Sequence, residues 1–259
     1  MCAGAGGSVA ASGVGCAGGV GCAGGVGCAG GEGGVSVSMP ATVPMGTWPA
    51  NFGDAMPARP AGVLLTGGAS RRMGCDKALI EVGGIPNAMR LAGALGQVAE
   101  PLVEVGPGRS GLPAVSEEPP GAGPLVALCA GWEALVTLGY SGPALVVACD
   151  LPFVTAESLA VLAGWPGVSS AVPVAGGWPQ PLCARWSAAD MEVAKELVAA
   201  GERSMKALLA QAAVELLSEV VWPGDPRHVF ADADTPEDLS RFGLAPSGVP
   251  TRSGAKHTR

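Results

Sequence analysis

Residues 63–77 read Val-Leu-Leu-Thr-Gly-Gly-Ala-Ser-Arg-Arg-Met-Gly-Cys-Asp-Lys, an apolar run that leads directly into a glycine-rich, basic segment. A loop after the first strand of a parallel sheet lies at the carboxyl edge, where open α/β folds bind their ligands. Gly67 and Gly68 let backbone N–H groups converge on an anion, and Arg72 and Lys77 bring positive charge to it. The stretch predicts an α/β domain with a polyphosphate site beside its first strand.

The charge of this loop is opposite to that of its surroundings. Residues 61–243 contain eleven Lys and Arg against twenty Asp and Glu. No glycine directly precedes Lys77 and Ala78 follows it, so the spacing is not that of a P-loop NTPase. The alternative from the loop alone is a glycine-rich turn with solvated arginine side chains.

From Ala61 onward, short apolar runs alternate with longer amphipathic ones, which is typical of βαβ units and a mostly parallel sheet. Thr155, Ser187 and Thr235 are expected to cap helices. We expect strands at 62–66, 102–105, 114–116, 144–149, 170–175, 181–186, 215–221 and 229–231, and helices at 86–98, 124–138, 156–163, 188–200, 204–212 and 236–241.

The two ends of the chain have a different composition from residues 61–243. Residues 13–30 are three copies of Gly-Val-Gly-Cys-Ala-Gly, which offer too little apolar surface to offset the entropy of ordering. We therefore expect residues 1–58 to be a disordered low-complexity tail, residues 61–243 to form one domain, and residues 244–259 to be a disordered tail.

Charge and cysteine spacing exclude several classes of protein. The net charge of −7 and the pI of about 4.8 argue against a nucleic-acid surface, which needs clustered Lys and Arg. No run reaches the ~18 apolar residues of a membrane helix, so we expect a soluble cytoplasmic protein. The eight cysteines form no C-x-x-C pair, which disfavours zinc and favours buried thiols in the domain.

Acidic residues follow two of the expected strands. Asp150 ends the apolar run 144–149, where it either caps a turn or, beside a triphosphate, offers the hard oxygen ligand that Mg²⁺ requires. Asp232 and Asp234 follow the expected strand 229–231, two residues apart, and so point to one face. We expect Asp232 to be the second metal ligand, with Asp234 either a ligand or the start of a helix cap.

Six motifs in order give the chain a family resemblance. They are residues 65–79 of the first loop, Gly-Ala-Gly-Pro-Leu at 121–125, Cys-Asp-Leu-Pro-Phe at 149–153, Gln-Pro-Leu-Cys-Ala at 180–184, Gly-Glu-Arg-Ser at 201–204 and Asp-Ala-Asp-Thr-Pro-Glu-Asp-Leu at 232–239. Together they cover residues 61–243, which resemble the molybdenum cofactor guanylyltransferase family. The pair Gly67-Gly68 favours this branch over the related cytidylyltransferases, which usually carry Ala-Gly there.

The resemblance implies a fold and a nucleotide site. The fold is the Rossmann-like three-layer sandwich of nucleotide-diphosphosugar transferases, with a mostly parallel mixed sheet. The backbone at Leu65, Thr66 and Gly67, continuing into Gly68, contacts the guanine nucleotide, and Lys77 holds its phosphates.

The resemblance also gives roles to other side chains. Arg72 joins Lys77 in holding phosphates, and Asp150 ligates Mg²⁺. The family places an acidic nucleotide contact before Gly-Pro-Leu, where Glu117 is the best match, and an asparagine near Gly106, where only backbone is available here. Arg203 is either a ligand of the acceptor phosphate or part of a helix cap.

The implied reaction transfers GMP from GTP to molybdopterin or Mo-molybdopterin with release of pyrophosphate. Transient contact with molybdopterin-synthesis proteins or apo-molybdoenzymes would accompany it. The alternatives are a cytidylyltransferase or a transferase acting on a sugar phosphate or phospholactate, and a catalytically silent GTP-binding maturation partner. The presence of Lys77 and Asp150 argues against the last of these.

Overall fold

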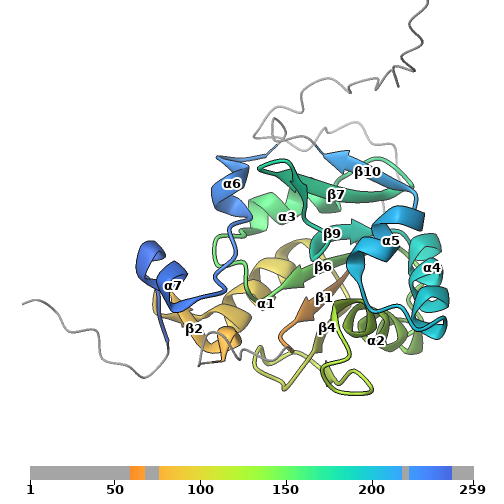
Figure 1. The fold of residues 1–259 in the computed structure, drawn as a ribbon, viewed down its shortest axis with the longest axis horizontal. Helices are drawn as coiled ribbons and strands as arrows, with labels where there is room; N and C mark the ends of the chain where they lie inside the picture. Colours follow the sequence, from red (N-terminus) through yellow and green to blue (C-terminus); the bar gives the residue numbers. More distant parts are fainter. Residues whose placement is uncertain (1–58, 68–75, 218–221, 247–259) are drawn as a thin grey trace, which may run out of the picture. The chain divides into compact units, whose positions relative to one another are not determined.

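The computed structural model describes residues 59–67, 76–217 and 222–246 (Figure 1). The expected tail of residues 1–58 lies outside this part of the chain, as do residues 247–259. Gly68 and Arg72 of the first loop also lie outside it. The fold described below is therefore that of the domain expected at residues 61–243, with a few flanking residues.

A single mixed sheet of eight strands forms the centre of the domain. Its order is β10-β7-β9-β6-β1-β4-β5, with β8 paired to β7. The pairs are parallel except where β9 meets β6 and β7 and where β8 meets β7. The strands are β1 (Ala61–Leu65), β4 (Leu102–Val105), β5 (Ala114–Val115), β6 (Ala144–Ala148), β7 (Ser170–Ala175), β8 (Trp178–Pro179), β9 (Cys183–Trp186) and β10 (Val214–Leu217).

Helices cover both faces of this sheet, which confirms the expected three-layer α/β fold (Figure 1). On one face lie α2 (Pro124–Thr137), α4 (Ala188–Ala199) and α5 (Met205–Gln211), and on the other α1 (Asn87–Val98), α3 (Ala156–Ala163) and α6 (Pro226–Val229). Among the described residues, none of the helices is long and apolar enough to cross a membrane.

The central strand β1 illustrates why its sequence is a continuous apolar run. Val63 and Leu65 join the core beneath α2 and α4, whereas Leu64 joins the core beneath α1 and α3. Successive side chains of a strand point to opposite faces, so a strand covered on both faces is apolar throughout. Gly131 lets α2 pack closely, because a Cβ there would lie 2.5 Å from a methyl carbon of Val63.

The expected helix starts are confirmed in the structure. The Thr155 hydroxyl accepts a hydrogen bond from the Ser158 N–H at 3.3 Å, and Ser187 caps α4. Thr235 begins α7 (Pro236–Phe242) with a reciprocal bond to Asp238. These side chains satisfy N–H groups that have no partner within the first turn of a helix.

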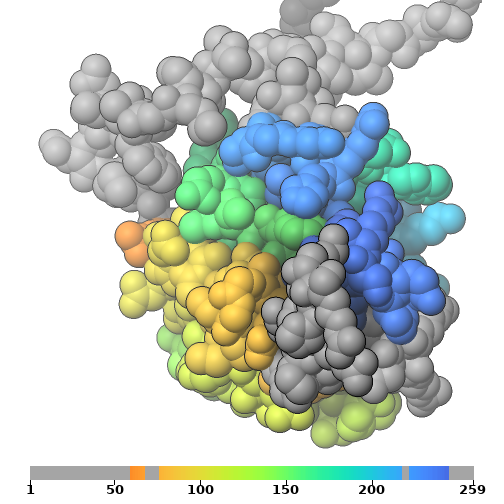
Figure 2. Space-filling view, turned by 90° about the vertical axis from the view of Figure 1, so that its left-hand side faces the viewer, coloured from red at the N-terminus to blue at the C-terminus, as the bar shows by residue number. Residues whose placement is uncertain are grey.

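A small second sheet was not expected from the sequence. The strands β2 (Ile80–Val82), β3 (Ile85–Pro86) and β11 (Ala245–Pro246) pair antiparallel, in the order β11-β2-β3. Figure 2 shows the face on which the early part of the chain, in orange and yellow, lies near its late part, in dark blue. Regular pairing therefore extends past the expected domain boundary at residue 243.

The strand expected at 229–231 is wrong. Pro226–Val229 form the short helix α6, which Asp225 caps through a 2.9 Å hydrogen bond to the Arg227 N–H. Pro226 at the first helical position favours this start. Val229 and Phe230 are buried against the α1 and α3 core, so their apolar character reflects packing of a helix end rather than a strand.

The cysteines of the described domain are buried, free thiols, as expected. They are Cys129, Cys149 and Cys183. Burial raises the pKa of Cys129 and of Cys149 to about 12. Neither side chain carries a thiolate at neutral pH, so neither is an activated nucleophile.

Candidate active site

The candidate site lies where β1 and β6 end side by side. These parallel neighbours pair Leu65 with Ala148, and the pairing continues one step further, because the Cys149 N–H donates to the Leu65 carbonyl at 2.9 Å. Thr66 and Asp150 thus leave the sheet at the same carboxyl edge. Among the described residues, the end of the first strand and Asp150 are therefore neighbours.

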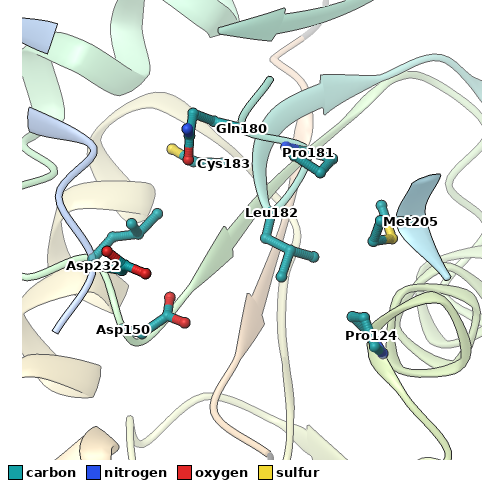
Figure 3. Close-up of a pocket in the computed structure, with 9 residues that line it drawn as sticks. Pro124, Asp150, Gln180, Pro181, Leu182, Cys183, Met205 and Asp232 are labelled. Carbon is teal, nitrogen blue, oxygen red and sulfur yellow. The ribbon is translucent and has the colours of Figure 1, made fainter. Parts of the chain in front are cut away.

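A cavity of about 260 Å³ opens at this edge (Figure 3). Two carboxylates stand at one end of it, and apolar side chains from the starts of α2 and α5 stand at the other. The segment before β9 runs between the two ends. The lining residues are Pro124, Asp150, Leu151, Gln180, Pro181, Leu182, Cys183, Met205 and Asp232.

The carboxylates of Asp150 and Asp232 lie near one another in the cavity (Figure 3). Burial raises the pKa of Asp150 above its ordinary value, and the negative charges of Asp234 and Asp232 raise it further, while Lys77 opposes them. Like charges this close repel unless a cation lies between them. The electrostatics therefore favour a cation at this end of the cavity.

Lys77 lies close to Asp150 and Asp234. It begins the short 3-10 helix Lys77–Leu79, where Asp76 accepts the Ala78 N–H at 3.1 Å, and its ammonium group forms an ion pair with Asp234. Burial acts to lower the pKa of Lys77, but the bond to Asp234 and the charge of Asp150 outweigh it, so the pKa lies above its ordinary value. Lys77 therefore remains charged at neutral pH.

The segment 231–234 carries both late acids, although it is not the end of a strand as expected. The Ala233 N–H donates to the Asp150 carbonyl at 2.9 Å, and Ala233 is buried. Asp232 on one side of it lines the cavity, and Asp234 on the other side meets Lys77. This anchor, rather than strand alternation, brings the acids of the late segment to Asp150.

The backbone of Thr66 and Gly67 is partly engaged within the protein. Both N–H groups donate to the Val105 carbonyl, at 3.0 and 3.1 Å. The sequence had indicated converging N–H groups at the start of the loop, and for these two residues the donors already have partners.

Gly106 must be glycine for a steric reason. It has a φ of +148°, and a Cβ there would lie 2.2 Å from the Thr66 hydroxyl oxygen and 2.6 Å from the Gly67 nitrogen. The asparagine that the family resemblance places near this position has no room at Gly106 itself. The Gly106 N–H donates to the Val115 carbonyl at 2.9 Å.

Glu104 is a buried charged residue at this edge of the sheet that sequence reasoning missed. Its carboxylate is fully buried and accepts from the hydroxyls of Thr66 and Ser110, and from the N–H groups of Arg109 and Ser110, both at 2.8 Å. Burial alone would raise the pKa of Glu104, but these donors outweigh it and the pKa lies below its ordinary value. A lone charged residue in the apolar run Leu-Val-Glu-Val was the signal available.

The loop after β4, which Glu104 binds through Arg109 and Ser110, also contacts the segment that leads into Lys77. The Arg109 guanidinium donates to the Asp76 carboxylate at 3.0 Å, one residue before Lys77. The pair is partly exposed, so solvent and salt screen its charges. It nevertheless links the loop after β4 to Asp76, which caps the helix Lys77–Leu79.

Of the described residues that were expected at the site, Asp150 and Asp232 line the cavity, whereas Leu65, Thr66, Gly67, Lys77, Glu117 and Arg203 do not. Glu117 accepts the N–H of Gly121 at 2.7 Å within its own loop. Arg203 donates to the carbonyls of Val198 and Glu202, at 3.0 and 2.8 Å. It therefore caps the end of α4, which was one of the two roles expected for it. Neither arrangement brings the side chain to Asp150.

The comparison of the chain with known families gives one match. A model described as the MobA-like NTP transferase domain matches residues 62–216. These residues run from β1 to β10 and contain Lys77 and Asp150 but not Asp232. The matched part therefore covers almost the whole main sheet.

Curated relatives support the same assignment. The chain is 34% identical over 192 residues to the molybdenum cofactor guanylyltransferase of Rhodobacter capsulatus, covering 71% of this chain and 94% of the relative. It is 34% identical over 186 residues to the probable molybdenum cofactor guanylyltransferase of Pelotomaculum thermopropionicum, covering 69% and 89%. The family resemblance seen in the motifs is confirmed.

Solved structures agree in fold. The structure titled molybdopterin-guanine dinucleotide biosynthesis protein A, from Archaeoglobus fulgidus, superposes with a TM-score of 0.55 over 70% of this chain and 95% of that chain, at 21% identity. A nucleotidyl transferase from Methanothermobacter gives a TM-score of 0.54 at 16% identity. At these identities the likeness establishes the fold alone.

Proposed function

We propose that this chain, which belongs to the MobA-like NTP transferase family, transfers GMP from GTP to the terminal phosphate of molybdopterin or Mo-molybdopterin. Membership of the family makes it a nucleotidyltransferase, and its curated relatives are named for the guanylyl reaction. The observation that carries the proposal is the meeting of Lys77, Asp150 and Asp232 at the carboxyl edge of β1 and β6.

In this reaction an oxygen of the acceptor phosphate attacks the α-phosphorus of GTP. The bond between the α-phosphorus and the bridging oxygen to the β-phosphate breaks, and pyrophosphate leaves with that electron pair. The acceptor phosphate is already an anion near neutral pH, so no protein group needs to act as nucleophile. Catalysis then consists of positioning two polyanions and neutralising their charge.

Lys77 is suited to the neutralising role because it stays protonated beside its acidic neighbours. In the described structure its partner is Asp234. We expect the nucleotide phosphates to compete with Asp234 for this ammonium group. Arg72, which lies outside the described residues, is proposed to act with Lys77.

The donor set at the acidic end fits Mg²⁺. Among the described residues no three acidic, histidine or cysteine side chains are grouped as a metal site, but Asp150 and Asp232 share the cavity. Mg²⁺ is commonly held by one or two carboxylates and completes its shell with phosphate oxygens and water. When bound, it would supply positive charge to the phosphates at the reacting centre.

The rest of the cavity is proposed to take the acceptor. Gln180, Pro181 and Leu182 run along it between the acidic end and the apolar end at Pro124 and Met205. With a cation bound between them, the two carboxylates would accommodate the acceptor phosphate, and the apolar end would contact the flat face of its ring system.

The test is pyrophosphate release from GTP, CTP, ATP and UTP, each with Mg²⁺ and molybdopterin. We expect release with GTP that depends on both Mg²⁺ and the acceptor. Release with CTP but not GTP would overturn the guanylyl assignment and favour a cytidylyltransferase. GTP binding without release from any nucleotide would favour a silent maturation partner.

A further inference from the structure

Two side chains of α1 hold the turn that carries Asp150. Asn87 is 1% exposed, and its side-chain amide donates to the Cys149 carbonyl at 2.8 Å. Arg90 donates to the Val154 carbonyl at 2.6 Å and, through a longer bond of 3.4 Å, to that of Leu151. The acceptors of these bonds lie on both sides of Asp150 in the sequence.

Asn87 and Arg90 also bind one another. The Arg90 Nε donates to the Asn87 side-chain oxygen at 2.9 Å, which fixes the amide so that its NH₂ group faces the Cys149 carbonyl. The carbonyl of Asp150 itself receives the Ala233 N–H. The three consecutive carbonyls at 149–151 are thus each bound by a donor from a distant part of the sequence.

The charge of Arg90 has no acidic partner within hydrogen-bond reach in the described part of the chain. Its acceptors are two carbonyl oxygens and an amide oxygen, and burial lowers its pKa. A partly buried cation with only neutral acceptors contributes little net stability, because desolvation opposes its hydrogen bonds. The planar guanidinium does, however, fix several acceptors in one geometry.

We propose that Asn87 and Arg90 are positioning residues that set the place of the Asp150 carboxylate for binding the divalent cation. The inference rests on the proposed function, since it requires Asp150 to be a metal ligand. Neither residue lines the cavity, so both act through the backbone of residues 149–154. Partners that orient metal ligands typically change metal affinity or activity about 10- to 100-fold when removed.

The test compares Arg90→Met with Arg185→Met, a matched control. Arg185 lies in β9, its pKa is also lowered by burial, and it also donates to a neutral carbonyl, that of Ser169 at 3.1 Å. Unlike the carbonyls that Arg90 binds, this acceptor does not belong to the turn that carries Asp150. Both variants are first checked by circular dichroism and thermal denaturation. Asn87→Leu and Arg90→Lys provide a second removal and a conservative replacement.

Two readouts report on the metal. One is the Mg²⁺ concentration for half-maximal pyrophosphate release. The other requires no turnover: Mn²⁺ bound by enzyme with GTP, beyond that bound by GTP alone, measured from the loss of the free Mn²⁺ signal in electron paramagnetic resonance. We expect Arg90→Met and Asn87→Leu to weaken both about tenfold or more, Arg90→Lys to recover part, and Arg185→Met to match the wild type.

Equal shifts in Arg90→Met and Arg185→Met would show a general structural effect and overturn the positioning role. Unchanged Mn²⁺ affinity in Arg90→Met, with affinity lost in Asp150→Asn, would overturn the positioning role alone. Unchanged affinity in Asp150→Asn would overturn the proposed metal site and the positioning role together.

Discussion

Glu104 near the end of β4 and Asp150 just beyond the end of β6 are carboxylates at the same edge of the sheet, in opposite surroundings. Glu104 is enclosed by four hydrogen-bond donors and its pKa is lowered. Asp150 faces two further acids, and its pKa is raised. The protein satisfies the first carboxylate from within its own fold. The second depends on positive charge from Lys77 and, in our proposal, from a bound cation and its phosphates.

The largest expected effect is the loss of activity when the Asp150 carboxylate is removed. Asp150→Asn should lower the rate of pyrophosphate release by about 10²- to 10³-fold, the size typical of losing one preorganised electrostatic contact. Its melting temperature should stay level or rise, because the substitution removes one of the repelling charges. Rates and thermal denaturation are measured on the same preparation, and a variant with near-normal rate would remove Asp150 from the site.

Removing the Glu104 carboxylate should, by contrast, have a large effect on the stability of the fold. Glu104→Leu leaves the hydroxyls of Thr66 and Ser110 and the N–H of Ser110 without their acceptor. Each buried polar group left unpaired costs about 1–3 kcal/mol, so the free energy of unfolding should fall by at least about 2 kcal/mol. Urea denaturation measures it. A stability equal to that of the wild type would contradict the structural role of Glu104.

The two late acids allow a finer comparison. Asp232 lines the cavity, whereas Asp234 pairs with Lys77 and donates its N–H to Asp238 at 3.2 Å. We expect Asp232→Ala to raise the Mg²⁺ concentration for half-maximal pyrophosphate release more than Asp234→Ala does. If the order is reversed, Asp234 rather than Asp232 completes the metal site.

The smallest expected effect is in the pH dependence of stability, without divalent cations. The folded pKa of Glu104 is lowered, so its ionised form stabilises the fold above its unfolded pKa and this contribution is lost as the pH falls through the folded pKa. The folded pKa of Asp150 is raised, so its ionised form destabilises the fold at neutral pH, and protonation relieves this as the pH falls.

Glu104→Gln should therefore be less stable than the wild type at neutral pH, and Asp150→Asn equally or more stable. As the pH falls, the stability of each variant should approach that of the wild type. Glu104→Gln should approach it from below, and Asp150→Asn should approach it from an equal or higher value. Urea denaturation between about pH 7 and pH 3, a range that spans the ordinary carboxyl pKa values, measures this convergence. Differences of the same sign would contradict the contrast between the two carboxylates.

The sequence predicted those parts of the site that directly follow the end of a strand. The apolar runs before Thr66 and Asp150 identify strands, and the residue after a parallel strand lies at the functional edge. The order of the strands then makes these two ends neighbours. Lys77 was predicted from its positive charge in a largely acidic domain, from its place in the loop after the first strand and from the family resemblance.

The parts that could not be predicted depend on contacts between distant segments. The amide of Asn87 meets a carbonyl 62 positions away, and Lys77 meets Asp234 across 157 positions. Neither partner is marked by local periodicity. The helix α6 was mistaken for a strand because the buried residues at its C-terminal end, Val229 and the following Phe230, form an apolar run too short for a helical period to be visible.

The pairing of β11 with β2 and the bond from Ala233 to Asp150 also bear on how the chain acquires activity during synthesis. A ribosome that has reached residue 217 has produced all eight strands of the main sheet but neither Asp232 nor Asp234. The nascent chain then carries the first loop and Asp150 without the second carboxylate of the cavity. Transfer competence, on our assignment, is thus a property of the finished domain and not of its sheet.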